Sequence, residues 1–438
     1  MKPLCGLLLA CGCLGVQASS LEQVRYGLHQ DARAEVEAPL RQLAARGDTP
    51  SQLLLADLLA GQGNSHQLPE AMALYQSAFD EGYGELNALG RLAALLERHP
   101  LHQARQRAFF QNALQQYAPG QDLTSLRNTL EVFWVYPDLL DPAHVRSLIE
   151  LYQRACLENC QVATYRAALA ERLGQEEQTD AYLRQALLSD PRALDRFHQR
   201  LGDEPAAPFR ALADTLEASR AELPLAVVQR IGALLSNLGD EYDPRVIGWL
   251  DHAIERGSVP ALHSRIAYML GHANHHGPDE TFALIDRYEQ HQSQQARALR
   301  ASALQVSQWP TLDPFKAQTL IQALIAEGYQ NAYLNLGELY SMGGLDEADQ
   351  FKAIEAYRQL TPTGHASAFY RLATVYARGR AICHDKVRAY AYARIAVDFG
   401  EQGAMRLLGQ LENEITPAEI AQALSRRDAL LREHEVGL

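Results

Sequence analysis

The chain has 438 residues, of which 47% are hydrophobic, and its formal net charge at pH 7 is −13. This length exceeds one ordinary globular core, and the hydrophobic content excludes a disordered chain, so several domains or a repeat array are expected. The negative charge argues against a wide nucleic-acid-binding surface. Leu, Ala, Gln, Glu and Arg are abundant and β-branched residues are sparse, which favours helices over strands.

The first 18 residues are typical of a secretory signal peptide. Lys2 supplies one positive charge, and the apolar run over residues 4–16 is too short to span a bilayer. Two processing routes stay open. Cleavage after Ala18 would fit an ordinary signal peptidase, whereas Cys11, preceded by Leu-Leu-Ala, or Cys13 could carry a lipid. We therefore expect an exported chain in the periplasm, soluble or attached to the outer membrane by a lipid anchor.

In residues 19–110, two of the glycines occupy the turn position of a repeat that is clearer further along the chain, namely Gly47 and Gly82. Residues 111–240 have the pattern of helices but few repeat landmarks, so degenerate tetratricopeptide-like units are expected there.

Two cysteines of this central segment, Cys156 and Cys160, flank the end of a predicted helix. A disulfide across a helix end is geometrically feasible, and export would place the pair in an oxidising compartment. Two free thiols are the alternative, and the spacing is wrong for a redox-active CxxC motif.

Residues 241–412 contain a 36-residue period. Gly328, Gly364 and Gly400 lie at this spacing, and Gly257 extends the register towards the N-terminus. Several other columns share the offset, among them Ala317, Ala353 and Ala389, and Ala332, Ala368 and Ala404. Each unit has two runs of apolar residues at helical spacing around its glycine, which accepts the positive φ of a tight reversal. Each unit is therefore predicted to be a helix hairpin that buries its apolar face against its neighbours.

Basic residues share the same register. Lys316, Lys352 and Arg388 form one column at the start of each first helix, and Arg371, Arg378 and Arg394 add charge nearby. In one interpretation their aliphatic stems cover the joint between units. In the other they form a basic ridge that binds an acidic polymer or partner, and these six residues are the candidate partner-binding site.

No motif points to catalysis. The sequence lacks a Gly-rich phosphate loop, HExxH and GxSxG, and no cofactor is expected. His272, His275 and His276 cluster near Asp279, but an exposed loop between helices accounts for them better than a metal site. Residues 413–438 are too few for a catalytic domain, and they predict one capping helix with Thr416 as its N-cap and Pro417 in its first turn.

The predicted fold is all-α: a right-handed α-solenoid of about ten to eleven helix-pair repeats. The string Ala353-x3-Tyr357-x6-Gly364-x3-Ala368, followed by Leu372-x3-Tyr376-x2-Gly379, resembles Sel1-like repeats, which are related to tetratricopeptide repeats. With regular units at both ends, a degenerate centre and an export signal, the whole chain resembles the periplasmic scaffold lipoproteins of bacterial alginate export.

This resemblance implies a non-catalytic scaffold. Its partners would be an outer-membrane alginate export porin and other periplasmic proteins of the alginate complex, with a weak contact to alginate itself. Two alternatives stay open, namely a Sel1-like adaptor in another envelope pathway and a degenerate protein related to the helical lytic transglycosylases.

Overall fold

The fold is all-helical. The computed structural model describes residues 20–29, 33–61, 67–81, 86–99, 102–116, 122–157, 160–201, 205–239, 241–342, 345, 349–379, 384–401 and 403–434. These residues form 24 α-helices and short 3₁₀ segments, without a β-strand. In chain order, α2 to α23 make eleven successive helix pairs, within the predicted number, and the prediction of an all-α fold of helix pairs is confirmed.

The chain divides into two compact units between Ala88 and Leu89, within the predicted segment 19–110. In the first unit α1 packs on α2, α2 on α3, and α3 on α4. Their bounds are Leu21–His29 for α1, Arg33–Ala44 for α2, Thr49–Gly61 for α3 and Leu68–Glu81 for α4. Helix α3 is the centre of this unit, since Leu55, Ala56 and Leu59 are almost entirely buried.

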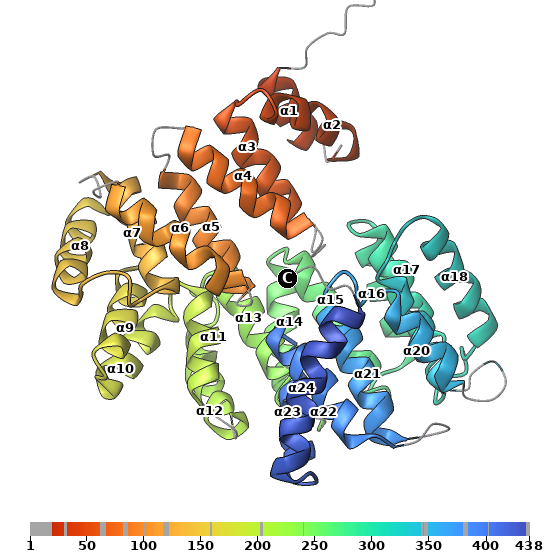
Figure 1. The fold of residues 1–438 in the computed structure, drawn as a ribbon. Helices are drawn as coiled ribbons and strands as arrows, with labels where there is room; N and C mark the ends of the chain where they lie inside the picture. Colours follow the sequence, from red (N-terminus) through yellow and green to blue (C-terminus); the bar gives the residue numbers. More distant parts are fainter. Residues whose placement is uncertain are drawn as a thin grey trace, which may run out of the picture. The chain divides into compact units, whose positions relative to one another are not determined.

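The second unit holds the remaining helices. Many successive helices pack side by side, as Figure 1 shows for α9 with α10 and for α21 with α22. The bounds are α5 Leu86–Arg98, which begins just before the division, α6 Gln103–Gln116, α7 Leu123–Val135, α8 Pro142–Ala155, α9 Val162–Arg172, α10 Glu176–Ala186, α11 Pro191–Arg200, α12 Ala206–Leu216, α13 Leu225–Leu235, α14 Pro244–Glu255, α15 Val259–Gly271, α16 Pro278–Glu289, α17 Ser293–Ala303, α18 Pro314–Ala326, α19 Ala332–Met342, α20 Gln350–Arg358, α21 Ala366–Arg378, α22 Lys386–Asp398, α23 Gly403–Glu412 and α24 Pro417–Glu433.

Within each pair the even-numbered helix comes first and the odd-numbered helix second. Second helices also contact the second helices of neighbouring pairs, namely α7 with α9, α11 with α13, α13 with α15, α15 with α17, α17 with α19, and α21 with α23. Alanine makes such close packing feasible because its side chain is short. Ala332, Ala368 and Ala404 of the second helices are fully buried, as are Ala317, Ala353 and Ala389 of the first helices.

The reversal inside each C-terminal pair depends on a glycine. Gly328, Gly364 and Gly400 have φ values of 84°, 67° and 88°, in the left-handed region where other residues are strained. The residue after the glycine donates its backbone N–H to a carbonyl five residues earlier, at 2.9 Å for Tyr329 to Leu324. This is the hydrogen bond of a Schellman motif, which ends a helix. Gly47 and Gly257 also have positive φ, whereas Gly82 lies outside the described residues.

The joint between consecutive pairs is built by a second column of residues, Asp313, Asp349 and Asp385. Each aspartate is an N-cap, and its carboxylate accepts a hydrogen bond from the backbone N–H three residues later, at 2.8–3.0 Å. Its own N–H donates to a carbonyl nine residues earlier, at 2.8, 2.9 and 3.2 Å respectively. The same two hydrogen bonds therefore connect one pair to the next at all three joints.

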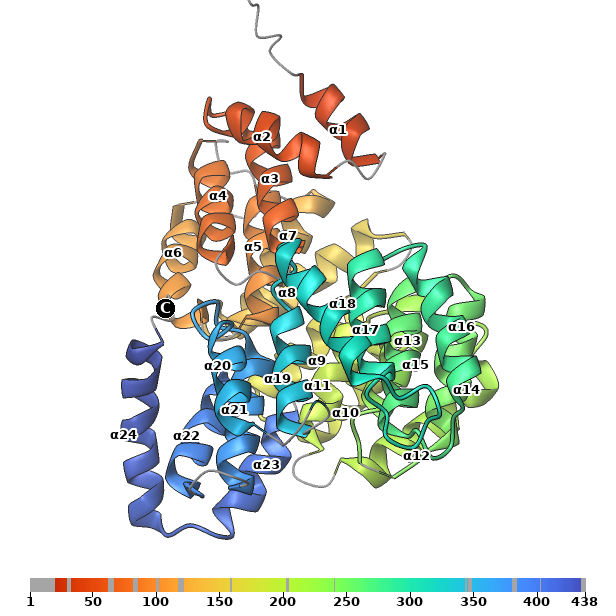
Figure 2. The same cartoon turned by 90° about the vertical axis from the view of Figure 1, so that its right-hand side faces the viewer.

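Helix α24 closes the C-terminal end of the stack by packing along α22, and both views show the two helices side by side (Figure 1, Figure 2). It begins with a capping box, in which the Thr416 side chain accepts from Glu419 N–H while the Glu419 carboxylate accepts from Thr416 N–H. The predicted N-cap and first-turn proline are confirmed. None of the described helices has the length and apolar character that a membrane crossing requires.

Candidate functional site

The predicted column of cations lies at the joints between pairs. The Lys352 ammonium is 3.2 Å from Asp349 and 5.7 Å from the ring centroid of Tyr340 in the preceding second helix. Arg388 repeats the arrangement, with its guanidinium 5.0 Å from the Tyr376 ring centroid and 3.7 Å from Asp385. These two side chains cover the joint, as in the first of the two interpretations.

The other predicted cations differ in their surroundings. Arg371 is ion-paired with Glu338, and Arg394 lies 3.4 Å from Asp398. Lys316 and Arg378 are exposed. Because four of the six cations have a carboxylate close by, they do not form a continuous, uncompensated basic ridge.

Sequence reasoning missed the aspartates that precede these cations. A lysine in the first turn of a helix is slightly unfavourable for the helix dipole, but an N-cap carboxylate three residues earlier compensates for it. The 36-residue spacing of Asp313, Asp349 and Asp385 is visible in the sequence and could have revealed them.

A shallow cavity of about 510 Å³ separates the neighbouring second helices α21 and α23. We call it the α21–α23 groove. Arg378 is the only member of the predicted set that lines it. Its lining residues are Tyr370, Thr374, Ala377, Arg378, Gly403, Arg406, Leu407, Gln410, Leu411 and Glu414.

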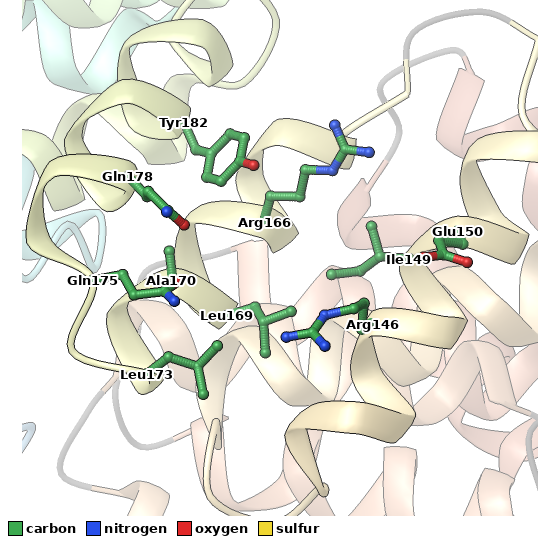
Figure 3. A pocket seen from close by; sticks show the side chains of 10 residues that line it. All are labelled: Arg146, Ile149, Glu150, Arg166, Leu169, Ala170, Leu173, Gln175, Gln178 and Tyr182. Atoms are coloured by element: carbon green, nitrogen blue, oxygen red, sulfur yellow. The ribbon is translucent and has the colours of Figure 1, made fainter.

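A second cavity of about 400 Å³ lies across α8, α9 and α10, in the segment where the sequence shows few landmarks (Figure 3). We call it the α8–α10 groove. It combines a buried apolar floor with two arginines, one glutamate, two glutamines and a tyrosine. Its lining residues are Arg146, Ile149, Glu150, Arg166, Leu169, Ala170, Leu173, Gln175, Gln178 and Tyr182.

An ionic cluster inside the second unit was also missed. The guanidinium of Arg192 lies 2.5 Å from Glu131, 2.9 Å from Asp190 and 3.6 Å from Glu97. Burial raises the pKa of Glu97, and the Arg192 charge partly opposes that shift. The Tyr165 hydroxyl donates to Glu131 at 2.8 Å, and burial holds the pKa of this phenol well above its usual value. The cluster ties α5, α7, α9 and the start of α11 together.

The histidines lie in the loop between α15 and α16, as the sequence suggested; His275 is exposed there, whereas His272 and His276 are partly buried. They surround Tyr242, where the His275 ring stacks at 4.2 Å between centroids and the rings of His272 and His276 approach edge-on. Burial lowers the pKa of His276, which favours the neutral ring. Within the described part of the chain, no three His, Cys, Asp or Glu side chains are placed so that they could hold a metal ion.

The two central cysteines are joined as a disulfide, with 5.9 Å between their Cα atoms. Cys156 is the C-cap of α8, so the bond spans the reversal between α8 and α9. Leu157, inside this loop, is 94% exposed. The lipidation candidates Cys11 and Cys13 lie outside the described residues.

These features define a fold of helix pairs with shallow grooves and exposed side chains. No protein-family model matches the chain, and no curated protein matches it. Solved structures with some similarity include a protective antigen with an SLR fold from uropathogenic Escherichia coli, at 14% identity and a TM-score of 0.29 over 95% of this chain and 94% of that one. A Sel1 repeat protein from Oxalobacter formigenes has 15% identity and a TM-score of 0.29, over 85% and 89%. At this similarity, the helix-pair fold is defined by the chain's own contacts.

Proposed function

We propose that the chain is a non-catalytic scaffold of the bacterial cell envelope. Its partners are an outer-membrane alginate export porin and other periplasmic proteins of the same secretion complex. The Sel1-like motif over Ala353–Gly379, the signal-like first 18 residues and the regular C-terminal pairs support this role. A stack of helix pairs provides an extended surface on which several partners can be held together.

The observation that carries the proposal is a repeated apolar and basic surface on the first helices. Phe315 and Phe351 occupy the same position of α18 and α20, and their exposed fractions are 64% and 72%. Lys316 and Lys352 follow them directly and are also exposed. Exposed aromatic side chains next to cations are typical of the anchoring residues of protein interfaces. We place the porin contact here.

The double substitution Phe315→Ser and Phe351→Ser tests this placement. We expect the affinity of the full-length chain for the purified export porin to fall by about tenfold or more, because the proposed interface would lose two exposed aromatic side chains that the porin would cover. Surface plasmon resonance would measure the change. Met405→Ser on α23 is the matched control, since Met405 is 62% exposed and lies in another helix pair. Unchanged affinity in the double variant would contradict the proposed contact.

The proposed location at the outer membrane has its own test. Mass spectrometry of the mature protein would distinguish cleavage after Ala18 from an acylated N-terminal cysteine at position 11 or 13. A full-length, unprocessed N-terminus in the native organism would contradict export.

A further inference from the structure

We propose that the α8–α10 groove binds the carboxylated sugar residues of an acidic polysaccharide, with Arg146 as the ligand of the carboxylate. The inference rests on the proposed function, because it supplies that scaffold with a site for the exported polymer. The site lies apart from Phe315 and Phe351 along the chain, in the central segment where sequence reasoning found no candidate binding residue.

Arg146, an exposed cation in the lining of the groove, lacks a carboxylate partner. Among the described residues, none lies within ion-pair distance of Arg146, and the neighbouring Glu150 is instead 3.9 Å from Arg154. The first unit has a cavity at the equivalent position, across a first helix, its second helix and the next first helix (α2, α3 and α4). The arginine of that cavity has carboxylate partners. There Arg41 is ion-paired with Glu37 and Glu70. Arg146 is therefore not ion-paired within the described part of the chain, and the two parallel N–H donors of its guanidinium suit a carboxylate.

The second arginine is held in place by uncharged groups. Arg166 donates to the Gln153 side chain at 2.8 Å, and its guanidinium lies 5.9 Å from the ring centroid of Tyr182. These contacts fix its orientation but leave its charge uncompensated. In a chain with a net charge of −13, two such arginines beside one groove create a local site for an anion.

The rest of the groove suits a sugar ring. Figure 3 shows the Arg146 guanidinium reaching towards Leu169, with Gln178 and Tyr182 on the facing side. Side-chain amides both donate and accept hydrogen bonds, as the hydroxyl groups of a sugar require. The buried side chains of Leu169 and Ala170 provide an apolar floor for the C–H face of the ring. A volume of about 400 Å³ falls within the size of small-ligand sites, roughly 300–1,000 Å³.

The test uses the purified full-length chain and short oligomannuronate as the probe, with binding measured by isothermal titration calorimetry. We expect Arg146→Gln to weaken binding by about tenfold or more, since it removes a charge-assisted hydrogen-bond pair. Arg127→Gln on α7 is the matched control, because it removes one exposed positive charge outside the groove. Glu150→Gln, which removes the only acid of the lining, should strengthen binding.

Two competitors define the ligand class. A neutral maltooligosaccharide of equal length should bind much more weakly, and so should oligoglutamate, which has carboxylates but no sugar hydroxyls. Equal binding of oligoglutamate would reassign the groove to acidic peptides. No effect of Arg146→Gln, or no binding by the wild-type chain, would overturn the proposal.

Porin affinity, measured on the same Arg146→Gln sample, should be unchanged. A wild-type chain that binds the porin but not oligomannuronate would overturn this inference alone, and one that binds oligomannuronate but not the porin would overturn the proposed scaffold role alone.

Discussion

Arg192 compensates carboxylates that would otherwise be buried without a partner. Asp190 and Glu131 have side-chain exposures of only 1% and 8%, and both contact the Arg192 guanidinium. A carboxylate removed from water needs a nearby positive charge or hydrogen bonds to stay ionised. Arg192 supplies both, and it is held above the Trp134 ring at 5.7 Å from the centroid.

We predict that Arg192→Met destabilises the second unit by about 3–5 kcal/mol, because the substitution leaves uncompensated charge in the interior. Arg154→Met should change the free energy of unfolding by less than about 0.5 kcal/mol, since Arg154 is 75% exposed and forms only a surface pair. Denaturant unfolding followed by circular dichroism would measure both. Similar midpoints for the two variants would show that the cluster contributes little to stability.

Two glycines of the same column differ in their surroundings and allow a second prediction. A Cβ atom at Gly364 would lie 2.7 Å from the Phe399 ring, whereas a Cβ at Gly328 would meet no atom within 4 Å. Both residues have positive φ, so Gly328→Ala should cost about 1 kcal/mol from backbone strain alone. Gly364→Ala should cost a further amount of about 1–3 kcal/mol from overpacking. Equal melting temperatures for the two variants would exclude the predicted clash with Phe399.

The sequence predicts the turn glycines well, but it does not predict the buried charges around Arg192. The turn glycines follow from a column at fixed spacing, because their role is local to one helix hairpin. The partners of Arg192 do not, because Glu131 is 61 residues away and only the packing of successive pairs brings the two together. The α8–α10 groove has the same origin, since its side chains come from three helices of a segment without a clear register.

At the scale of single elements, helix α24 is attached to the preceding helix pairs through its C-cap, the buried residue His434. The ring of His434 is hydrogen-bonded to Thr361, after α20, and to Tyr392 in α22. The Thr361 hydroxyl donates to the Arg358 carbonyl at 2.9 Å, so it accepts from Nδ1–H of His434 at 2.9 Å. The Tyr392 hydroxyl then donates to Nε2 at 2.9 Å. This hydrogen-bond pattern assigns the neutral ring with its proton on Nδ1.

This attachment predicts a pH dependence. Burial lowers the pKa of His434 below its ordinary value of 6.5, Arg358 lowers it further, and Glu433 partly opposes the shift. A lowered pKa in the folded state means that protonation favours the unfolded state. The stability that His434 contributes is therefore complete well above pH 6.5 and is lost progressively as the pH falls from 6.5 towards the lowered pKa of the folded state.

Hydrogen exchange over residues 417–433 would measure the effect, after correction for the intrinsic pH dependence of exchange. We expect less protection of α24 at pH 5.5 than at pH 7.5. His434→Gln is the control, because glutamine can make both hydrogen bonds without titrating. If the variant keeps the full pH dependence of the wild-type chain, another group is responsible.

At the scale of the whole chain, the two compact units should respond separately to destabilisation. Leu59 in α3 and Leu250 in α14 are both fully buried, one in each unit. We expect Leu59→Ala to cost about 2–5 kcal/mol and to speed hydrogen exchange over α2–α4 but not over α14 and α15. Leu250→Ala should have the reverse effect. Faster exchange throughout the chain in either variant would show that the two units unfold as one.

The sequence predicted the helix-pair fold well but not the division near Ala88. Helix pairs can be predicted from the spacing of apolar residues and from turn glycines, which are local signals. The apolar spacing is present even where the 36-residue register is weak. The division depends on how many contacts cross one point of the chain, and no residue type near Ala88 marks it. The handedness of the superhelix stays a prediction for the same reason, since it arises from small rotations between successive pairs.

The joints at Asp313, Asp349 and Asp385 have a consequence for how such a chain can change its length. Each joint uses one cap and one backbone hydrogen bond, and neither depends on which unit lies on the other side. A duplication of residues 349–384 would create a new joint with the same two bonds and the same 36-residue spacing. The number of helix pairs can therefore change by whole units without any change to the hydrogen bonds of a joint.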